Sequence, residues 1–260
     1  MYIAAHKKFS VPHVKDYTPL EVGAALRKEH FGYLRDDEGE NISDQNPFFC
    51  ELTAYYWIWK NSDADIVGLS HYRRYFSKYR INPNEKYYLT TDEIEQLLSQ
   101  YDVILPEHFY WRKHTVKSGY YAGAGVNGDL ETIGEIIKEL YPEYLDDYYH
   151  VLSAHEASYC NMFVMKKHDF DAYCQWLFDI LFEAQKRIDI SGYTPAEKRI
   201  FGYMSELLLN VWIEQNQKRV CYKPMVVNAP FGKKKKLLRI CESMGINALT
   251  KTVYCVDNPF

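Results

Sequence analysis

No window of the sequence approaches 18 consecutive apolar residues, so we expect no segment to cross a membrane as a helix. Basic residues are not in excess: 31 Lys and Arg stand against 35 Asp and Glu, which gives a net charge of −4. This balance argues against a general nucleic-acid-binding protein. The six cysteines are far apart, which excludes a CxxC redox motif and paired zinc-ligand spacing. No basic segment precedes an apolar stretch at the start, so we expect no signal peptide and a reducing, cytoplasmic location.

Tyrosine, by contrast, is abundant, with 24 residues among 260, and aromatic side chains make up 16% of the chain. A tyrosine offers a flat apolar face and a hydroxyl group, which suits sugars and nucleobases, although most tyrosines pack in a core. No internal repeat and no Pro/Gly/Ser-rich linker divides the sequence. We therefore predict a single domain over residues 1–260, with 229–260 as a basic C-terminal extension.

Strand-like and helix-like segments alternate along the chain. Short apolar runs predict strands at 2–5, 66–69, 102–106, 161–165 and 220–227, the last at a sheet edge because Pro224 lacks an N–H. Apolar residues at helical spacing predict helices at 48–59, 91–100, 129–140, 168–187, 195–215 and 233–244. The stretches 10–45 and 107–128 are expected to be irregular. This order predicts an α/β fold, with a mostly parallel central sheet flanked by helices.

Two short motifs resemble cofactor sites but stand in the wrong context. Gly123, Gly125 and Gly128 match the GxGxxG pattern of dinucleotide-binding proteins, yet no buried strand precedes them as that motif requires. Asp63 and Asp65 form a DxD pair, which in many enzymes holds a metal ion and a nucleotide diphosphate. They precede the strand at 66–69, whereas ligands of open α/β sheets bind beyond the carboxyl ends of strands. We interpret the first motif as a loop and the second as a solvated turn.

The segment His71-Tyr72-Arg73-Arg74 follows that same strand, at the end where ligands bind. Two guanidinium groups and an imidazole there can neutralise a diphosphate without a metal, because arginine presents a planar fork that fits phosphate oxygens. The alternative, a pair of exposed arginines that pack through their aliphatic stems, stays open at this point.

Four longer blocks resemble one known family: NISDQNPFFCELTAYYWIWKN, DIVGLSHYRRYF, NMFVMKKHDFDAYCQWLFDILFE and RIFGYMSELLLNVWIE. That family was first catalogued as a domain of unknown function. Its members occur in bacterial capsular-polysaccharide and O-antigen clusters, and some are galactofuranosyltransferases with a glycosyltransferase-A-type fold. The resemblance extends from AAHKKF to the strand before Pro224. Two departures stand out: Leu207 replaces an arginine that follows the glutamate, and the glycine loop at 119–128 replaces a stretch with histidines.

The resemblance implies a glycosyltransferase-A-like fold and a hexosyltransferase that moves a sugar from a UDP-sugar to a lipid-linked surface polysaccharide. Galactofuranose as the sugar, and inversion at its anomeric carbon, are implied by the galactofuranosyl relatives. The arginines favour a reaction without a metal cofactor, with Mn²⁺ or Mg²⁺ as the alternative. The two departures support a second interpretation, in which the chain is a catalytically inactive sugar- or nucleotide-binding domain of the same fold.

The resemblance also suggests roles for individual residues. Similar enzymes carry a base carboxylate where a helix follows the second half of the sheet, which corresponds to Glu206. Glu156 is the alternative base, and pairing with Arg199 is the alternative role of Glu206. Arg73 is expected to help UDP to depart, and Gly23 to let uracil approach closely because it has no side chain. The expected donor-binding residues are His6, Lys7, Gly23, Asn41, Asp44, His71, Tyr72, Arg73, Arg74 and Arg199.

The predicted C-terminal helix is basic and amphipathic. Four lysines at 233–236 and Arg239 lie beside apolar Leu237, Leu238 and Ile240. Such a helix can dock peripherally on the anionic inner face of the cell membrane, where a lipid-linked acceptor would be found. A solvated helix that covers the sheet edge is the alternative, and the sequence does not decide between them.

Overall fold

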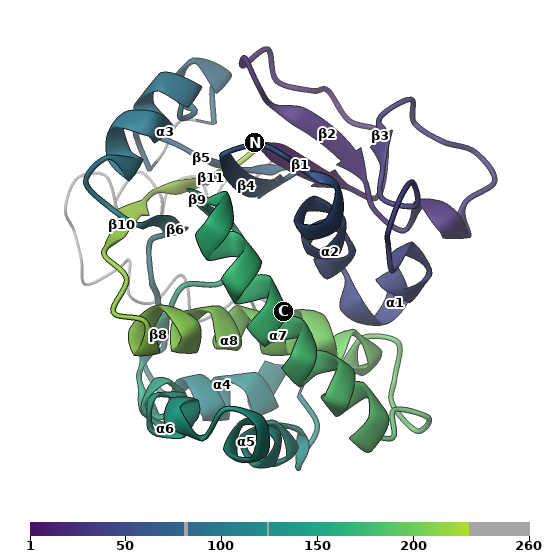
Figure 1. Ribbon diagram of the computed structural model, residues 1–260, viewed down its shortest axis with the longest axis vertical. Coiled ribbons are helices and arrows are strands. Elements are labelled where there is room, and N and C mark those ends of the chain that lie inside the picture. The colour runs from purple at the N-terminus through teal and green to yellow at the C-terminus, as the bar shows by residue number, and fades with distance from the viewer. Residues whose placement is uncertain (81–82, 124, 229–260) are drawn as a thin grey trace.

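A mostly parallel sheet lies at the centre of the protein. The computed structural model describes residues 1–80, 83–123 and 125–228, in which the strand order is β10-β6-β9-β4-β1-β2-β3 (Figure 1). β9 runs antiparallel to both of its neighbours, and the other adjacent pairs in this row are parallel. The predicted α/β class is therefore confirmed. The strands span β1 Tyr2–Ala5, β2 Thr18–Glu21, β3 Leu34–Arg35, β4 Ile66–His71, β6 Val103–Pro106, β9 Phe163–Lys166 and β10 Val220–Lys223.

Four short strands lie off this row. β5 (Arg74–Phe76) turns back directly after β4 and pairs antiparallel with β4 and with β11 (Met225–Val227). β7 (Phe109–Tyr110) and β8 (Glu156–Ala157) form a separate two-stranded sheet. The tight β4–β5 connection leaves Tyr72 and Arg73 at the carboxyl end of a central strand.

The helices flank the sheet and also form a layer beyond it, where α5 packs on α7 and α6 on α8 (Figure 1). Among the described residues, no helix is both long and apolar enough to cross a bilayer. The helix predicted at 233–244, and the extension 229–260, lie outside the described residues. The α-helices span α1 Asn46–Phe49, α2 Leu52–Asn61, α3 Thr91–Leu98, α4 Val116–Gly123, α5 Asp129–Leu140, α6 Leu145–Ser153, α7 Lys167–Arg187 and α8 Ile200–Gln215; short 3-10 turns span η1 Ala24–Leu26, η2 Ser43–Gln45, η3 Glu85–Tyr87, η4 Pro142–Tyr144 and η5 Glu197–Arg199.

Aromatic side chains fill the core between α2, α7 and the sheet. The rings of Phe163 in β9 and Phe170 in α7 are stacked with centroids 4.7 Å apart. Tyr55 of α2 packs on Phe163 at 4.9 Å and, like Tyr173, has no exposed surface. Large buried rings contribute strongly to core stability through the apolar area that they bury. Many of the abundant tyrosines therefore serve packing, which gives the site a rigid support.

Two stretches expected to be irregular contain regular structure. Residues 10–45 hold β2 and β3, and residues 107–128 hold β7 and α4. β2 and β3 are short, and pairing with a neighbouring strand, β2 with β1 and β3 with β2, stabilises them rather than a pattern of their own. In α4, a Cβ on Gly119 would lie 3.0 Å from the Trp111 ring, so this glycine supports close packing although glycine is a poor helix former.

Two predicted elements are interrupted. The strand expected at 220–227 is divided at Pro224 into β10 and β11, because proline cannot continue the ladder of hydrogen bonds, and β10 does lie at the sheet edge. The helix expected at 48–59 is divided at Cys50, whose φ is 51°. The Asn46 side chain stabilises this break, since its Nδ2 donates to Cys50 O at 2.7 Å. The helix expected at 195–215 begins instead at Ile200, after η5.

A buried aspartate fixes the loop that follows β2. Asp36 has no exposed surface, and its carboxylate accepts hydrogen bonds from the backbone N–H groups of Gly23 (2.9 Å) and Ala24 (3.0 Å). It also accepts from Ser43 Oγ at 2.5 Å. The carboxylate thus satisfies donors that water cannot reach, and it holds the backbone next to Val22 in place.

Replacing this carboxylate tests whether it holds the loop. We expect Asp36→Asn to lower the free energy of unfolding by about 2 kcal/mol, because an amide nitrogen would face buried donors where an oxygen now accepts. Urea denaturation measures the change. Asp44→Asn, on the exposed surface of η2, is the matched control and should change stability by less than about 0.5 kcal/mol. Equal effects of the two substitutions would contradict this role of Asp36.

Candidate functional site

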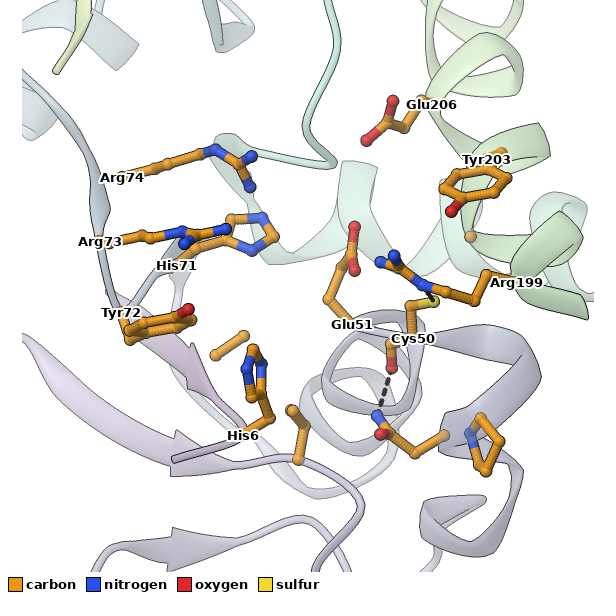
Figure 2. A pocket seen from close by; sticks show the side chains of 15 residues that line it. His6, Cys50, Glu51, His71, Tyr72, Arg73, Arg74, Arg199, Tyr203 and Glu206 are labelled. Atoms are coloured by element: carbon orange, nitrogen blue, oxygen red, sulfur yellow. Dashed lines mark hydrogen bonds between the residues drawn. The ribbon is translucent and has the colours of Figure 1, made fainter. Parts of the chain in front are cut away.

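A cavity of about 570 Å³ opens at the carboxyl ends of β1, β2 and β4 (Figure 2). These ends lie at one edge of the sheet because β1 pairs in parallel with both β2 and β4, and this edge is where open α/β sheets bind ligands. Residues of the α1–α2 junction, η5 and α8 complete the lining. We call this the strand-end cavity; it is lined by Ala4, His6, Val22, Asn46, Pro47, Cys50, Glu51, His71, Tyr72, Arg73, Arg74, Arg199, Gly202, Tyr203 and Glu206.

Three arginines face one another across the cavity. Arg73 and Arg74 extend from the β4–β5 connection, and Arg199 extends from η5 on the opposite side (Figure 2). In the part of the chain that the structure describes, none of the three forms an ion pair with a carboxylate; the arginines that do so lie elsewhere. The Arg199 Nε donates instead to Cys50 Sγ at 3.1 Å. Three guanidinium groups without a carboxylate partner form a site suited to an anion.

His6, Lys7 and Arg73 lie around the Tyr72 ring at the β1 side of the cavity. The His6 ring meets the Tyr72 ring edge-on at 5.0 Å, and Lys7 Nζ and the Arg73 guanidinium lie 5.1 and 5.4 Å from the Tyr72 ring centroid. Burial lowers the pKa of His6, and the positive charges of Lys7 and its neighbours lower it further. His6 is therefore neutral near pH 7, so that one ring nitrogen can donate a hydrogen bond and the other can accept one.

Glu206 brings a buried carboxyl group to the same cavity. Its side chain is 7% exposed, and Oε2 has no hydrogen-bond partner among the described residues. Burial raises the pKa of Glu206 well above its usual value and the charge of Glu51 raises it further, although Arg74 and Arg199 act in the opposite direction. A carboxyl group whose pKa moves toward neutrality can take up or release a proton near working pH, as general acid-base chemistry requires.

His71 differs from its sequence-based interpretation. Its Nε2 lies 2.6 Å from Cys160 O, and because a carbonyl oxygen only accepts, Nε2 carries the ring proton. Burial lowers the pKa of His71 to about 4; Arg74 and Arg73 also lower it, whereas Glu51 and the bond to Cys160 act in the opposite direction. The positive charge of this segment therefore comes from its two arginines and not from the imidazole.

The cavity brings together part of the predicted site. The predicted residues that line it are His6, His71, Tyr72, Arg73, Arg74, Arg199 and Glu206. Lys7 lies beside it, on Tyr72. Gly23 follows the lining residue Val22 with a φ of 65°, and a Cβ there would lie 2.7 Å from Asn46 Oδ1, so glycine is required by the backbone conformation as well as by the close packing. The functional roles of these residues stay predictions.

Besides Lys7 and Gly23, three predicted residues do not line the cavity. The Asn41 side chain bonds its own loop, through Gly39 O at 2.8 Å, and Asp44 is exposed in η2. Glu156 is exposed in β8, where its carboxylate lies 3.4 Å from His108 Nδ1. Asn41 and Glu156 bond to Gly39 and His108, which lie near them in the fold, and neither forms a contact with the arginines.

The two motifs set aside in the sequence lie away from these arginines. Asp65 immediately precedes β4, at the opposite end of the strand from Arg73, and it borders a second cavity together with Asp16 and Glu95. Gly123 ends a helix and not a strand, so the dinucleotide motif lacks its required context. The described residues contain no group of three or more His, Cys, Asp or Glu side chains that could hold a metal ion.

Among the lining residues with polar or ionisable side chains, sequence analysis missed Asn46, Cys50, Glu51 and Tyr203. Two of them, Cys50 and Glu51, belong to the segment 48–59 that was predicted to be a continuous helix, and Asn46 lies two residues before it. The break at Cys50 places Glu51 at the cavity, where Asn161 Nδ2 donates to Glu51 Oε1 at 2.8 Å. The one sequence feature that could have pointed to Glu51 was an acidic residue at the edge of an otherwise apolar helical pattern.

The fold and the cavity define an α/β protein with an arginine-lined, carboxyl-containing site at the carboxyl edge of a mostly parallel sheet. The chain belongs to the family described as Domain of unknown function (DUF4422), whose model matches residues 1–217. It is similar to the apo structure of WbbM, a bifunctional glycosyltransferase, with a TM-score of 0.77 and 31% sequence identity over 88% of this chain and 45% of the WbbM chain. The chain thus spans less than half the length of that relative. No curated protein matches it significantly. The resemblance seen in the sequence is confirmed for the family and the fold.

The buried carboxyl group of Glu206 should reduce stability at neutral pH. Because folding raises its pKa above the usual 4.5, the folded state holds this proton more tightly, and stability falls as pH rises from about 4.5 toward the folded pKa. Glu206→Gln removes this loss. The variant should exceed the wild type in unfolding free energy at pH 8 by more than the roughly 0.5 kcal/mol typical of surface substitutions. Near pH 4 the two should be alike.

Urea denaturation at several pH values measures this difference. Glu156→Gln changes an exposed carboxylate and serves as the control, with no comparable gain expected. A Glu206→Gln variant that is no more stable than the wild type at pH 8 would show that its carboxyl group is adequately solvated or paired.

Proposed function

We propose that this protein is a glycosyltransferase that moves a hexose from a UDP-sugar to a lipid-linked surface polysaccharide. The observation that carries the proposal is that three arginines without carboxylate partners, among the described residues, share one cavity with a buried carboxyl group. Guanidinium groups bind phosphate oxygens, and a carboxylate can take a proton from a hydroxyl group. Sugar transfer from a nucleotide diphosphate needs both. The similarity to WbbM, a bifunctional glycosyltransferase, supports the same activity.

The donor diphosphate is proposed to lie between Arg73 and Arg74 on one wall and Arg199 on the other. As the bond between the sugar and the phosphate breaks, UDP leaves with the bonding electron pair, and the arginines stabilise the negative charge that develops on it. Uracil is proposed to lie at the β1 side, near His6 and the loop after Val22, where a neutral imidazole and backbone groups can bond its polar edge.

Glu206 is proposed as the general base that removes the proton from the acceptor hydroxyl. Its raised pKa gives the carboxylate a greater affinity for that proton than an exposed glutamate has. A single base that activates the acceptor on the face opposite the leaving group gives inversion. Galactofuranose as the transferred sugar rests on the family resemblance.

We propose that no metal ion is required. The arginines supply the positive charge that a diphosphate needs, and the Asp63 and Asp65 pair precedes β4, at the end opposite the arginines. Mn²⁺ or Mg²⁺ bound with the donor is the alternative, and transfer rates of the wild type in EDTA and with each cation distinguish the two.

The acceptor is proposed to be a lipid-linked oligosaccharide of a capsule or O-antigen, which implies a cytoplasmic enzyme in peripheral contact with the inner face of the membrane. This part of the proposal rests on the resemblance and on the basic sequence at 233–244. Leu207, one of the two departures from the family pattern, is 1% exposed, belongs to the core and is not among the lining residues. It therefore does not alter the lining of the strand-end cavity.

Calorimetry with UDP and UDP-sugars, followed by a transfer assay and NMR of the product, tests the function. Donor binding together with a glycoside product would support it. Binding without turnover on any acceptor would favour the inactive sugar- or nucleotide-binding domain instead, and no binding of any nucleotide would contradict both interpretations.

We expect Arg73→Ala to lower kcat roughly 100-fold. Loss of one preorganised donor at a developing charge typically costs about 3 kcal/mol in the transition state. Steady-state transfer rates measure the effect, with and without EDTA. Arg187→Ala is the matched control, because Arg187 pairs with Glu139 and Glu183 outside the cavity, and its rate should stay at the wild-type level. An unchanged rate in Arg73→Ala would remove this arginine from the mechanism.

We expect Glu206→Gln to lower kcat by about 100-fold or more, since an amide cannot accept the proton and general base catalysis contributes about 10²–10⁴-fold. Glu156→Gln should retain the wild-type rate, because Glu156 does not line the cavity. The same transfer assay compares the two variants. Wild-type turnover in Glu206→Gln with loss of turnover in Glu156→Gln would reverse the assignment.

A further inference from the structure

The turn before β9 holds two consecutive residues in the left-handed conformation, Cys160 with a φ of 77° and Asn161 with a φ of 46°. Non-glycine residues rarely adopt this conformation, and they concentrate at functional sites. The turn lies behind the strand-end cavity, because Cys160 O accepts the hydrogen bond from His71. Asn161 is 1% exposed, so its side chain is a buried polar group that must find partners.

The Asn161 side chain connects two walls of the cavity. Its Nδ2 donates to Glu51 Oε1 at 2.8 Å and to Gly202 O at 2.9 Å, and its Oδ1 lies 2.9 Å from Ser205 Oγ. Both partners of the nitrogen only accept, which fixes the orientation of the amide. Asn161 therefore ties Glu51, at the α1–α2 junction, to the turn of α8 that leads into Glu206.

The group that donates to Glu51 is the Asn161 amide, and its lack of charge affects the electrostatics of the cavity. An amide is neutral, so it fixes the Glu51 carboxylate without cancelling its negative charge, as a lysine or arginine in its place would do. That charge acts on Glu206: after burial, Glu51 is the largest cause of the raised pKa of Glu206. The placement of Glu51 therefore affects how tightly Glu206 holds a proton.

We propose that Asn161 is a positioning residue: its amide holds the Glu51 carboxylate in place, and Glu51 in turn sets how readily Glu206 accepts a proton. The electrostatic part stands on the hydrogen bonds of Asn161, on the cavity that Glu51 and Glu206 both line, and on the charge of Glu51 acting on Glu206. Its catalytic consequence rests on the proposed function, in which Glu206 is the base. Without Asn161, Glu51 is free to rotate toward Arg199 or solvent, and its effect on Glu206 weakens.

Other charged and titratable groups also act on Glu206, and the test must hold them constant. Arg74 of β5 and Arg199 of η5 lower its pKa, while His71 of β4 stays neutral above a pKa of about 4. The thiols of Cys50 and Cys160 stay neutral because burial raises the pKa of each to about 12. The phenols of Tyr55, Tyr159 and Tyr203 also have raised pKa values, with burial the largest cause. Glu51 is thus the charged neighbour that Asn161 controls directly.

The experiment titrates Glu206 by NMR in protein labelled with ¹³C at the glutamate carboxyl carbons, with Glu206→Gln to assign the signal. Asn161→Gly removes the amide, and glycine accepts the positive φ without strain. We expect the pKa of Glu206 to fall by roughly one unit in Asn161→Gly and similarly in Glu51→Gln. The double variant should match Glu51→Gln alone, because Asn161 acts through Glu51. In transfer assays, the low-pH limb of kcat/KM should move to lower pH by the same amount.

Asn210→Ala is the matched control. Asn210 of α8 also makes partly buried hydrogen bonds, to the backbone of Ser158 and to the backbone oxygen of Glu206, but it forms no bond to Glu51. It should destabilise the protein and leave the Glu206 titration unchanged. Should Asn161→Gly fail to fold, Asn161→Ser, whose shorter side chain does not reach Glu51, is titrated in its place with the same expectation.

An unchanged titration of Glu206 in Asn161→Gly would overturn the proposal, and so would a shift that persists in full in the Glu51→Gln background. The NMR titration needs no substrate, so it decides the role of Asn161 even when no transfer activity is found. A shifted titration combined with an unmoved kcat/KM profile would support the positioning role and would overturn Glu206 as the base.

Discussion

The arrangement of the strand-end cavity depends on a carboxyl group that is buried with one oxygen unpartnered in the described structure, that of Glu206. An ionised carboxylate in such a place is unfavourable unless nearby charges compensate for the lost water. Arg74 and Arg199 supply part of that compensation from opposite sides, and Glu51 opposes it. The result is a carboxyl group that holds its proton more tightly than an exposed glutamate does, beside positive charge suited to an anionic ligand. Acid-base chemistry and anion binding thus occur in one cavity.

The backbone near Glu206 adopts uncommon conformations that place the charged groups around the cavity. Cys50, Cys160 and Asn161 all have positive φ values, and each such residue costs on the order of 1–3 kcal/mol. The break at Cys50 brings Glu51 to the cavity, and the turn at Cys160 and Asn161 bonds His71 and Glu51. The surrounding structure maintains this strain, because α8 is buried along most of its length and the aromatic core of α7 packs against it.

The parallel pairing of β1 with β2 and β4 supplies the other half of the cavity. It places His6, Val22 and Tyr72 at one edge of the sheet, each just past the end of a strand. In the loop after β2, the buried Asp36 carboxylate supports the backbone by accepting hydrogen bonds from two N–H groups. The rigid sheet edge and the loop held by Asp36 together support the side of the cavity that is proposed to bind the nucleotide.

The sequence by itself determined the order of strands and helices in outline, because short apolar runs and helical spacing are local properties. α5 at Asp129–Leu140 and α7 at Lys167–Arg187 have bounds at or within one residue of those predicted. It also located Arg73, Arg74 and His6, since residues that follow parallel strands gather at one edge, and it indicated Glu206 through the family resemblance. It missed β2, β3 and α4, whose short or glycine-containing segments depend on neighbours for stability.

Only the tertiary structure decided the electrostatics of the cavity. Glu51 and Asn161 are 110 residues apart in the chain and bond directly, and Arg199 reaches Cys50 across 149 residues; no local pattern encodes such pairs. His71 beside two arginines suggested a cation, yet burial and the charges of those arginines keep it neutral although Cys160 O accepts a hydrogen bond from it. Protonation depends on which groups exclude water and which charges lie within a few ångströms, and those distances exist only after the chain has folded.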